Sequence, residues 1–246
     1  MSKLAMIVLN RIWTAAANAE AAGAVTLCFA TFAWLVRGAT ASGAIAGAGV
    51  CFALILGAGW GAFAALCTVF VLTWIATRIG YARKLKLGTA ESRRGRDALQ
   101  VLANVAVAAA CAVMLRFAHN ADYAAATAAA LAEAAGDTVE SEIGQALGST
   151  PRLITNWQRV PAGTDGAITT AGTLAGVLAV VTVSAVCFAT GVIPGRAAFI
   201  CAGSAILATL LDSLLGATLE RNRRLGNNSV NFLSTLFAAA LAFAMS

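Results

Sequence analysis

Acidic residues gather in the second half of the chain, at spacings that would let several of them act together. Glu133, Asp137 and Glu140 stand at positions i, i+4 and i+7, so their carboxylates share one face of a continuous helix. No Lys or Arg occurs between Arg116 and Arg152 to neutralise them. A hard divalent ion such as Mg²⁺ binds carboxylate and phosphate oxygens together and would relieve the repulsion. The alternative interpretation is the solvated end of an ordinary helix.

Asp212 is a further candidate because it lies inside an otherwise apolar run. It precedes Glu220 by eight residues, which is about 12 Å along a helix axis, so it lies well below the surface. An acidic side chain inside a membrane segment is costly and therefore a functional candidate. Such a group needs a partner, which would be a basic residue, a metal ion or several amides. Asn228 and Asn231, at the start of the next apolar run, supply amides.

A glycine-rich turn lies between these two acidic regions. Thr164 and Asp165 stand between Gly163 and Gly166, and glycines let the backbone curl so that its N–H groups face an anion. The pattern is typical of a phosphate-binding turn, but it is also common where a loop simply joins two helices.

A polar stripe leads from a basic loop into an apolar helix. Arg93, Asp97, Gln100 and Asn104 follow the spacing i, i+4, i+7 and i+11. Lipid cannot satisfy Gln100 or Asn104, so the stripe faces either the other helices or a polar cavity. Helix-to-helix hydrogen bonding and substrate binding both fit this pattern.

Together these segments offer carboxylates, amides, arginines and a glycine turn, which suits phosphates held with Mg²⁺. Phosphoryl transfer depends mainly on positioning and charge neutralisation. The chain has no Walker loop, no protein-kinase motif set and no GxSxG elbow.

The composition determines what kind of scaffold must position these groups. The chain has 246 residues, of which 60% are hydrophobic and 11% are charged, whereas soluble domains carry roughly 25% charged residues. A soluble enzyme, a disordered protein and a nucleic-acid-binding module are therefore excluded. We predict an all-α, polytopic transmembrane helical bundle that forms a single integral membrane domain over residues 1–246.

A helix that crosses the bilayer needs about 20 mainly apolar residues, and this criterion predicts about seven to eight spans. The fifth candidate run is short, rich in alanine and carries Glu133, so we expect it inside the bundle. The first residues, MSKLAMIVLNRIW at 1–13, are expected to form an amphipathic interfacial helix. The eight candidate runs are residues 19–36, 39–58, 60–77, 98–118, 121–136, 170–191, 197–219 and 229–245.

The basic residues predict the orientation. If the runs cross alternately, thirteen of the 17 Lys and Arg residues lie on one face, in Arg37, the basic loop 78–96, the segment 137–168 and the segment 220–228. Cytoplasmic loops carry this excess, so the active-site loops are expected to face the cytoplasm, and the protein to lie in a bacterial inner membrane.

Five motifs, in order, give the chain a resemblance to the integral-membrane phytyl-phosphate kinase family. This family is distantly similar to CTP-using dolichol kinases and phosphatidate cytidylyltransferases. The resemblance covers about residues 90–245. The motifs are GRDALQVLAN at 95–104, GDTVESEIG at 136–144, PAGTDG at 161–166, DSLLGA at 212–217, and NN at 227–228 with VNF at 230–232.

The resemblance implies transfer of a phosphoryl group from a nucleoside triphosphate, with CTP the expected donor, to a prenyl monophosphate such as phytyl or geranylgeranyl phosphate. The expected partners are the lipid bilayer, the prenyl monophosphate, the nucleotide with Mg²⁺, and a second copy of the chain in a homodimer. Three sets of site residues follow. The catalytic residues would be Asp137, Asp165 and Asp212; the metal ligands Asp137, Glu140, Glu142 and Asp212; and the nucleotide- and phosphate-binding residues Arg96, Gln100, Asn104, Gly163, Thr164, Gly166, Asn228 and Asn231.

Two alternative functions fit part of the pattern. A CTP-dependent nucleotidyl transfer to a phospholipid would use the same groups and release pyrophosphate. A small-solute or lipid transporter would place its polar groups near the bilayer midplane, whereas here they gather toward one face.

Overall fold

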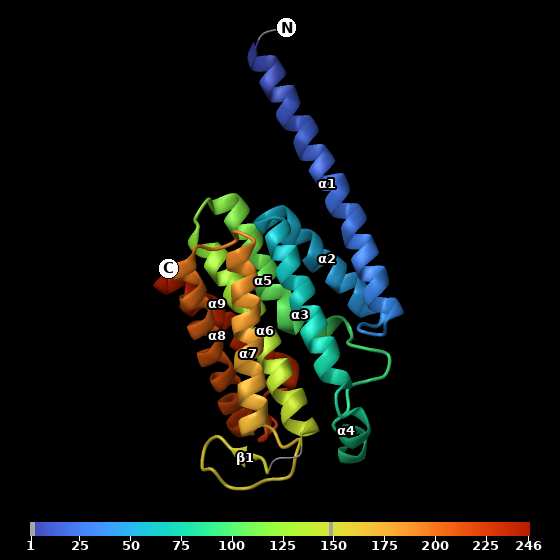
Figure 1. The fold of residues 1–246 in the computed structure, drawn as a ribbon, viewed down its shortest axis with the longest axis vertical. Coiled ribbons are helices and arrows are strands. Elements are labelled where there is room, and N and C mark those ends of the chain that lie inside the picture. The colour runs from blue at the N-terminus through green and yellow to red at the C-terminus, as the bar shows by residue number, and fades with distance from the viewer. Residues whose placement is uncertain (1–2, 148–149) are drawn as a thin grey trace.

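The computed structural model describes residues 3–147 and 150–246, and most of them are helical (Figure 1). Polar residues between the apolar runs cap the ends of several helices. Thr40 caps α2 by accepting a hydrogen bond from Gly43 N, and Thr169 caps α7 in the same way through Gly172 N. The elements are α1 Lys3–Leu35, α2 Ala41–Ala58, α3 Trp60–Arg78, α4 Tyr81–Leu87, α5 Ala98–Ala118, α6 Asp122–Ala146, β1 Arg152–Leu153, β2 Ala167–Ile168, α7 Thr170–Ala189, α8 Gly195–Leu215, the π-helical turn η1 Gly216–Glu220, and α9 Asn227–Met245.

Among the described residues, six helices are long and apolar enough to cross a membrane, rather than the seven or eight predicted. These are α2, α3, α5, α7, α8 continued through η1, and α9. Predicted spans 19–36 and 121–136 are not among them. The first belongs to the 33-residue α1. Residues 3–13 of the expected interfacial helix are the start of this same continuous helix and not a separate element, and residues 1–2 lie outside the described residues. The second begins α6, which carries several acidic residues. The all-α membrane architecture is confirmed.

Helix α6 forms the centre of the bundle, as its alanine-rich sequence predicted. It contacts α3, α5, α7, α8 and α9, and every side chain from Ala124 to Ala135 is buried. Small residues allow these close approaches in a membrane protein. A Cβ on Gly136 would lie 2.5 Å from a Val180 methyl group, and one on Gly176 would lie 2.9 Å from Gly136 O. Because its neighbours cover it, α6 can carry acidic groups that a lipid-facing helix could not.

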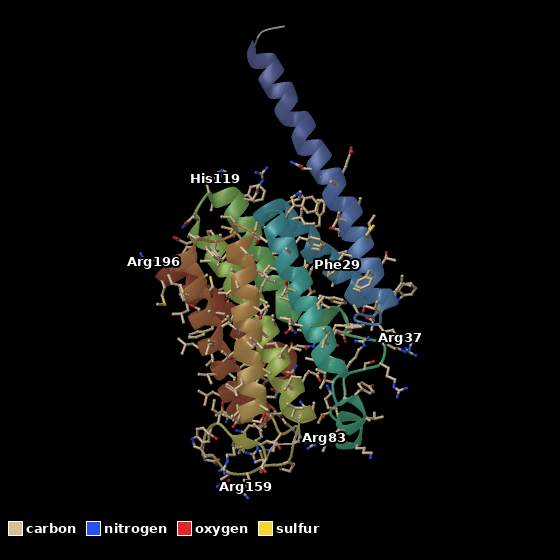
Figure 2. The ribbon with its side chains drawn as sticks, viewed as in Figure 1. Phe29, Arg37, Arg83, His119, Arg159 and Arg196 are labelled. Carbon is tan, nitrogen blue, oxygen red and sulfur yellow. The ribbon has the colours of Figure 1, made fainter. Side chains whose placement is uncertain are left out.

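The connections containing most of the basic residues lie at one end of the bundle. Figure 2 shows Arg83 and Arg159 at this end and His119 at the other. We call it the basic end. The loop 150–169 also lies there and contains a short antiparallel pair, with β1 Arg152 opposite β2 Ile168. The alternate crossing of the helices therefore brings the polar segments of the sequence to one surface.

Candidate active site

A polar cavity of about 300 Å³ opens at the basic end of the bundle. Every residue that the sequence analysis selected for the site lines it, although these residues come from five separate segments. What the structure shows is their location; their chemical roles remain predictions. The predicted residues in the lining are Arg96, Gln100, Asn104, Asp137, Glu140, Glu142, Gly163, Thr164, Asp165, Gly166, Asp212, Asn228 and Asn231.

One side of the cavity, which we call the acidic wall, is lined by Asp137, Glu140 and Glu142 of α6 and Asp212 of α8. The side chains of Asp137 and Asp212 lie within hydrogen-bonding reach of each other. Ser234 on α9 donates to Asp212 Oδ2 at 3.1 Å. One helical turn deeper, Glu133 is 1% exposed, and its Oε1 has no hydrogen-bond partner in the described part of the chain. A buried carboxylate thus lies beneath a pair of carboxylates that are partly exposed to the cavity.

The other two predicted metal ligands already have protein partners. Thr173 on α7 donates to Glu140 Oε1 at 2.6 Å. Glu142 forms an ion pair with Lys84 and accepts a hydrogen bond from Thr77 Oγ1 at 3.1 Å. Sequence analysis found no basic residue close enough along the chain to neutralise this acidic group. Lys84 reaches it from α4, which is distant in sequence but adjacent in the fold.

Lys84 joins three helices at the edge of the cavity. It is fully buried, and its ammonium group also donates to the carbonyls of Ala76 at 3.1 Å and Thr77 at 2.8 Å. These carbonyls belong to the last turn of α3, where a cation is favoured. The Lys84–Glu142 pair therefore fixes α4 and α3 to α6. It leaves Asp137 and Asp212 as the acidic pair that has no ion-pair partner among the described residues.

The acidic wall can serve a metal ion only together with further oxygen ligands. Within residues 3–147 and 150–246, no three His, Cys, Asp or Glu side chains are grouped so as to hold a metal by themselves. Asp137 and Asp212 offer two adjacent carboxylates in the lining of the polar cavity.

Amide side chains form the opposite wall. Asn231 Nδ2 donates to Asn104 Oδ1 at 3.3 Å, and Asn104 Nδ2 donates to the Gln100 carbonyl at 2.8 Å. Gln100 also completes a capping box with Asp97, in which each side chain bonds the other's backbone N–H at 2.9 Å. The polar stripe thus forms structural hydrogen bonds, with Asp97 capping the start of α5, and Gln100 and Asn104 also line the cavity.

The glycine turn packs against the π-helical turn of α8. Gly166 has φ +70°, and a Cβ there would lie 2.2 Å from Ala217 N; Gly163 has φ +86°, and a Cβ there would lie 2.2 Å from a Thr89 methyl carbon. Both positions therefore require glycine for backbone conformation and close approach. Thr164 Oγ1 donates to Pro161 O at 2.8 Å. Backbone conformation and packing therefore explain why these two positions are glycine. The turn also lines the polar cavity.

A second cavity of about 350 Å³ lies beside the first and is mainly apolar. Side chains of α1, α2, α3 and α5 line it, including Phe29, Val50, Leu66 and Phe70. Toward the basic end its lining changes to arginines. Arg37, just beyond the end of α1, lies in this part of the lining together with Arg78, Arg93 and Arg96. The sequence analysis predicted no such chamber.

The two cavities have four lining residues in common. They are Glu91, Arg96, Gln100 and Asn104. The sequence analysis did not predict Glu91 as a site residue. It is the only acidic residue in the basic segment 78–96, and this isolated negative charge is the signal that could have identified it. These four side chains mark the place where a ligand in the apolar chamber would meet a ligand in the polar cavity.

Comparison with known proteins identifies the group to which the chain is related. The family model described as integral membrane protein DUF92 matches residues 24–239. The chain belongs to this family. Among its DUF92-like relatives, the uncharacterized membrane protein sll0875 of Synechocystis sp. is 34% identical over 189 residues, which are 75% of this chain and 73% of the relative.

Two further relatives cover much of the chain. The chloroplastic protein VTE6 of Arabidopsis thaliana is 32% identical over 227 residues, which are 86% of this chain and 66% of VTE6. The uncharacterized membrane protein MJ0933 of Methanocaldococcus jannaschii is 34% identical over 176 residues, which are 70% of each chain. No solved structure matches the chain. These matches confirm the family resemblance given by the five motifs, and the DUF92 match extends it from residue 90 back into α1.

Proposed function

We propose that this chain is a membrane-embedded prenyl-phosphate kinase. The observation that carries the proposal is the meeting of an apolar chamber and an acidic, amide-rich cavity at Arg96, Gln100 and Asn104. A prenyl monophosphate has a long apolar tail and one charged end, so it needs both environments in this order. Its tail would occupy the chamber between α1, α2, α3 and α5, and its phosphate would reach the shared wall.

The reaction would transfer the γ-phosphoryl group of a nucleoside triphosphate to an oxygen of the prenyl phosphate. The products would be a nucleoside diphosphate and a prenyl diphosphate. The triphosphate would lie in the polar cavity, beside the Gly163–Gly166 turn and the Asn228 and Asn231 amides. Arg96 would contact both the donor and acceptor phosphates and offset their charge, which is the main requirement of such a transfer. CTP is the donor that the motif resemblance favours.

Asp137 and Asp212 would hold Mg²⁺, with Glu140 and Glu142 at the edge of the same acidic wall. When bound, Mg²⁺ would neutralise charge on the phosphate oxygens and hold the reacting groups in line. Asp165 lines the cavity from the loop, where we place it as the third catalytic carboxylate. The amides of Asn104 and Asn231 would orient the acceptor without adding charge.

We place the basic end at the cytoplasmic surface of the membrane. Most of the Lys and Arg residues lie in connections at this end, as cytoplasmic loops require. This orientation would open the polar cavity to soluble nucleotide, while the apolar chamber would lie within the bilayer.

The proposal is tested by incubating the purified protein in detergent with geranylgeranyl or phytyl monophosphate, Mg²⁺ and CTP, ATP, GTP or UTP in turn. Formation of prenyl diphosphate and nucleoside diphosphate in equal amounts is expected, and chelation of Mg²⁺ should stop it. Release of pyrophosphate would instead indicate nucleotidyl transfer. Solute or lipid flux in vesicles without nucleotide, with no product of either kind, would indicate a transporter and overturn the proposal.

Filling the apolar chamber should discriminate against long prenyl chains. Gly47 lines the chamber, and a Cβ there would meet only a Val101 methyl carbon at 4.0 Å. Gly47→Leu should therefore be accommodated by the helix while it occupies chamber volume. We expect KM for geranylgeranyl phosphate to rise about tenfold, with little change for the shorter geranyl phosphate.

Gly49→Leu is the matched control. Gly49 lies on the same helix, is exposed, and has no atom within 4 Å of a Cβ placed there. This variant should keep both KM values. An equal loss with both chain lengths in Gly47→Leu, or an equal effect in Gly49→Leu, would show that the chamber does not hold the tail.

A further inference from the structure

Glu91 occupies the shared wall from a loop rather than from a helix. It lies between α4 and α5, and its backbone carbonyl accepts a hydrogen bond from the Tyr81 hydroxyl at 3.1 Å. Its Oε1 accepts from the neighbouring Ser92 N at 2.7 Å. Its Oε2 accepts from Gln100 Nε2 at 3.1 Å and lies 3.9 Å from Arg96 Nε. The carboxylate therefore engages donors of two side chains that line both cavities.

These donors are the groups that the phosphate of a bound lipid would require. A guanidinium group and an amide N–H bind carboxylate and phosphate oxygens through the same charge-assisted hydrogen bonds. The Glu91 side chain is about one-fifth exposed, so it is partly buried and still has contact with solvent. A phosphate cannot accept hydrogen bonds from the same donors while the carboxylate occupies them. The phosphate and the carboxylate would also repel each other because both are negatively charged.

We infer that the Glu91 carboxylate holds the place of the acceptor phosphate on Gln100 and Arg96 and is displaced by that phosphate when it binds. This inference rests on the proposed entry of a prenyl phosphate through the apolar chamber. A phosphate monoester brings up to two negative charges and exceeds the carboxylate as a partner for Arg96. A free prenol brings a neutral hydroxyl, which cannot displace a carboxylate from a guanidinium group. Glu91 thus competes with the phosphate of the lipid and lowers its affinity, whereas binding of the alcohol does not depend on Glu91.

Displacement is feasible because of where Glu91 is attached. The backbone of the α5 N-terminus is held independently by the Asp97–Gln100 capping box. Rotation of the Glu91 side chain breaks its bonds to Gln100 and Ser92 without removing any hydrogen bond of α5. The acceptor site can therefore exchange one anion for another while the helix stays formed.

The test is ligand binding without nucleotide, using Glu91→Gln in detergent. Glutamine retains an oxygen that can accept from Gln100 and Ser92, but it removes the charge. We expect the variant to bind geranylgeranyl monophosphate about tenfold more tightly than the unmodified protein does, with affinity for geranylgeraniol unchanged. Thermal unfolding midpoints that agree within a few degrees would show that the fold is retained.

Asp122→Asn is the matched control because it removes one carboxylate at the N-terminus of α6, at the other end of the bundle, and Asp122 lines neither cavity. It should leave both affinities as they were. Unchanged, weaker or absent monophosphate binding in Glu91→Gln, or an equal gain for the alcohol, would overturn the inference. Tighter monophosphate binding without any phosphoryl transfer would keep the inference and reject only the kinase reaction.

Discussion

Replacing either Asp137 or Asp212 with Asn is expected to lower kcat/KM for prenyl-phosphate phosphorylation by at least about a thousandfold. Asn is nearly the same size and can still accept the hydrogen bond that Ser234 donates to Asp212 at 3.1 Å. The change removes one negative charge from the adjacent pair, and with it a ligand suited to Mg²⁺. The loss should appear mainly in kcat and should not be restored by saturating nucleotide.

The same two variants should be more stable than the unmodified protein when Mg²⁺ is absent. Two carboxylates side by side in a poorly solvated cavity repel each other, so neutralising one should raise the free energy of unfolding by about 1 kcal/mol. Thermal unfolding in detergent, with Mg²⁺ and with EDTA, measures this. The unmodified protein should be stabilised by Mg²⁺ and nucleotide, and the variants should not.

The control for both measurements is Asp122→Asn, which should retain activity and the Mg²⁺ response. Variants at Asp137 and Asp212 that keep near-normal turnover would contradict the proposed metal pair. Variants that lose turnover together with several kcal/mol of stability would indicate that the carboxylates are structural.

Much of the candidate site could be predicted because the position of a residue within a spanning helix determines how far it lies from the membrane surface. Asp137 lies in the last part of one helix, Asp212 in the last part of another, and Gln100 near the start of a third. Helices that cross alternately bring these parts to one surface, whichever helices are neighbours. Residue type and distance along the chain were therefore sufficient to group the acidic and amide side chains.

Features that depend on which helices are neighbours could not be predicted. Lys84 neutralises Glu142 across 58 residues of sequence, and neither the spacing nor the composition of either segment indicates that contact. The apolar chamber could not be predicted from the sequence either. Val50, Leu66 and Phe70 line it only because their helices are neighbours in the fold, and their residue types are equally common on lipid-facing surfaces.

The span count was wrong for a related reason. Hydropathy measures whether a helix can face lipid, whereas α6 packs against α3, α5, α7, α8 and α9. Its acidic residues lower its hydropathy without any contact with lipid. The central position of α6 allows the acidic wall to exist, because a helix on the outside of the bundle would expose Glu133 to hydrocarbon.

Replacing Arg96 with Ala is expected to lower kcat/KM by about a thousandfold for both the nucleotide and the prenyl phosphate. Arg96 is the only cationic side chain, among the described residues, that lines both cavities, so its loss should weaken both substrates instead of one. The backbone around it should survive, because Thr40 N bonds the Arg96 carbonyl at 2.9 Å and Arg96 N bonds the Gly38 carbonyl at 3.2 Å. Neither bond involves the side chain.

Two companion variants separate charge from geometry in a steady-state assay that varies each substrate in turn. Arg96→Lys keeps the charge but loses the planar fork of the guanidinium group, and we expect it to recover only part of the loss, remaining about ten- to a hundredfold below normal. Arg94→Ala removes an exposed arginine two residues away that lines neither cavity, and it should behave normally. Full activity in Arg96→Lys would reduce Arg96 to a simple source of positive charge. A loss in Arg96→Ala confined to one substrate would place Arg96 in one cavity alone and separate the two sites that the proposed transfer must join.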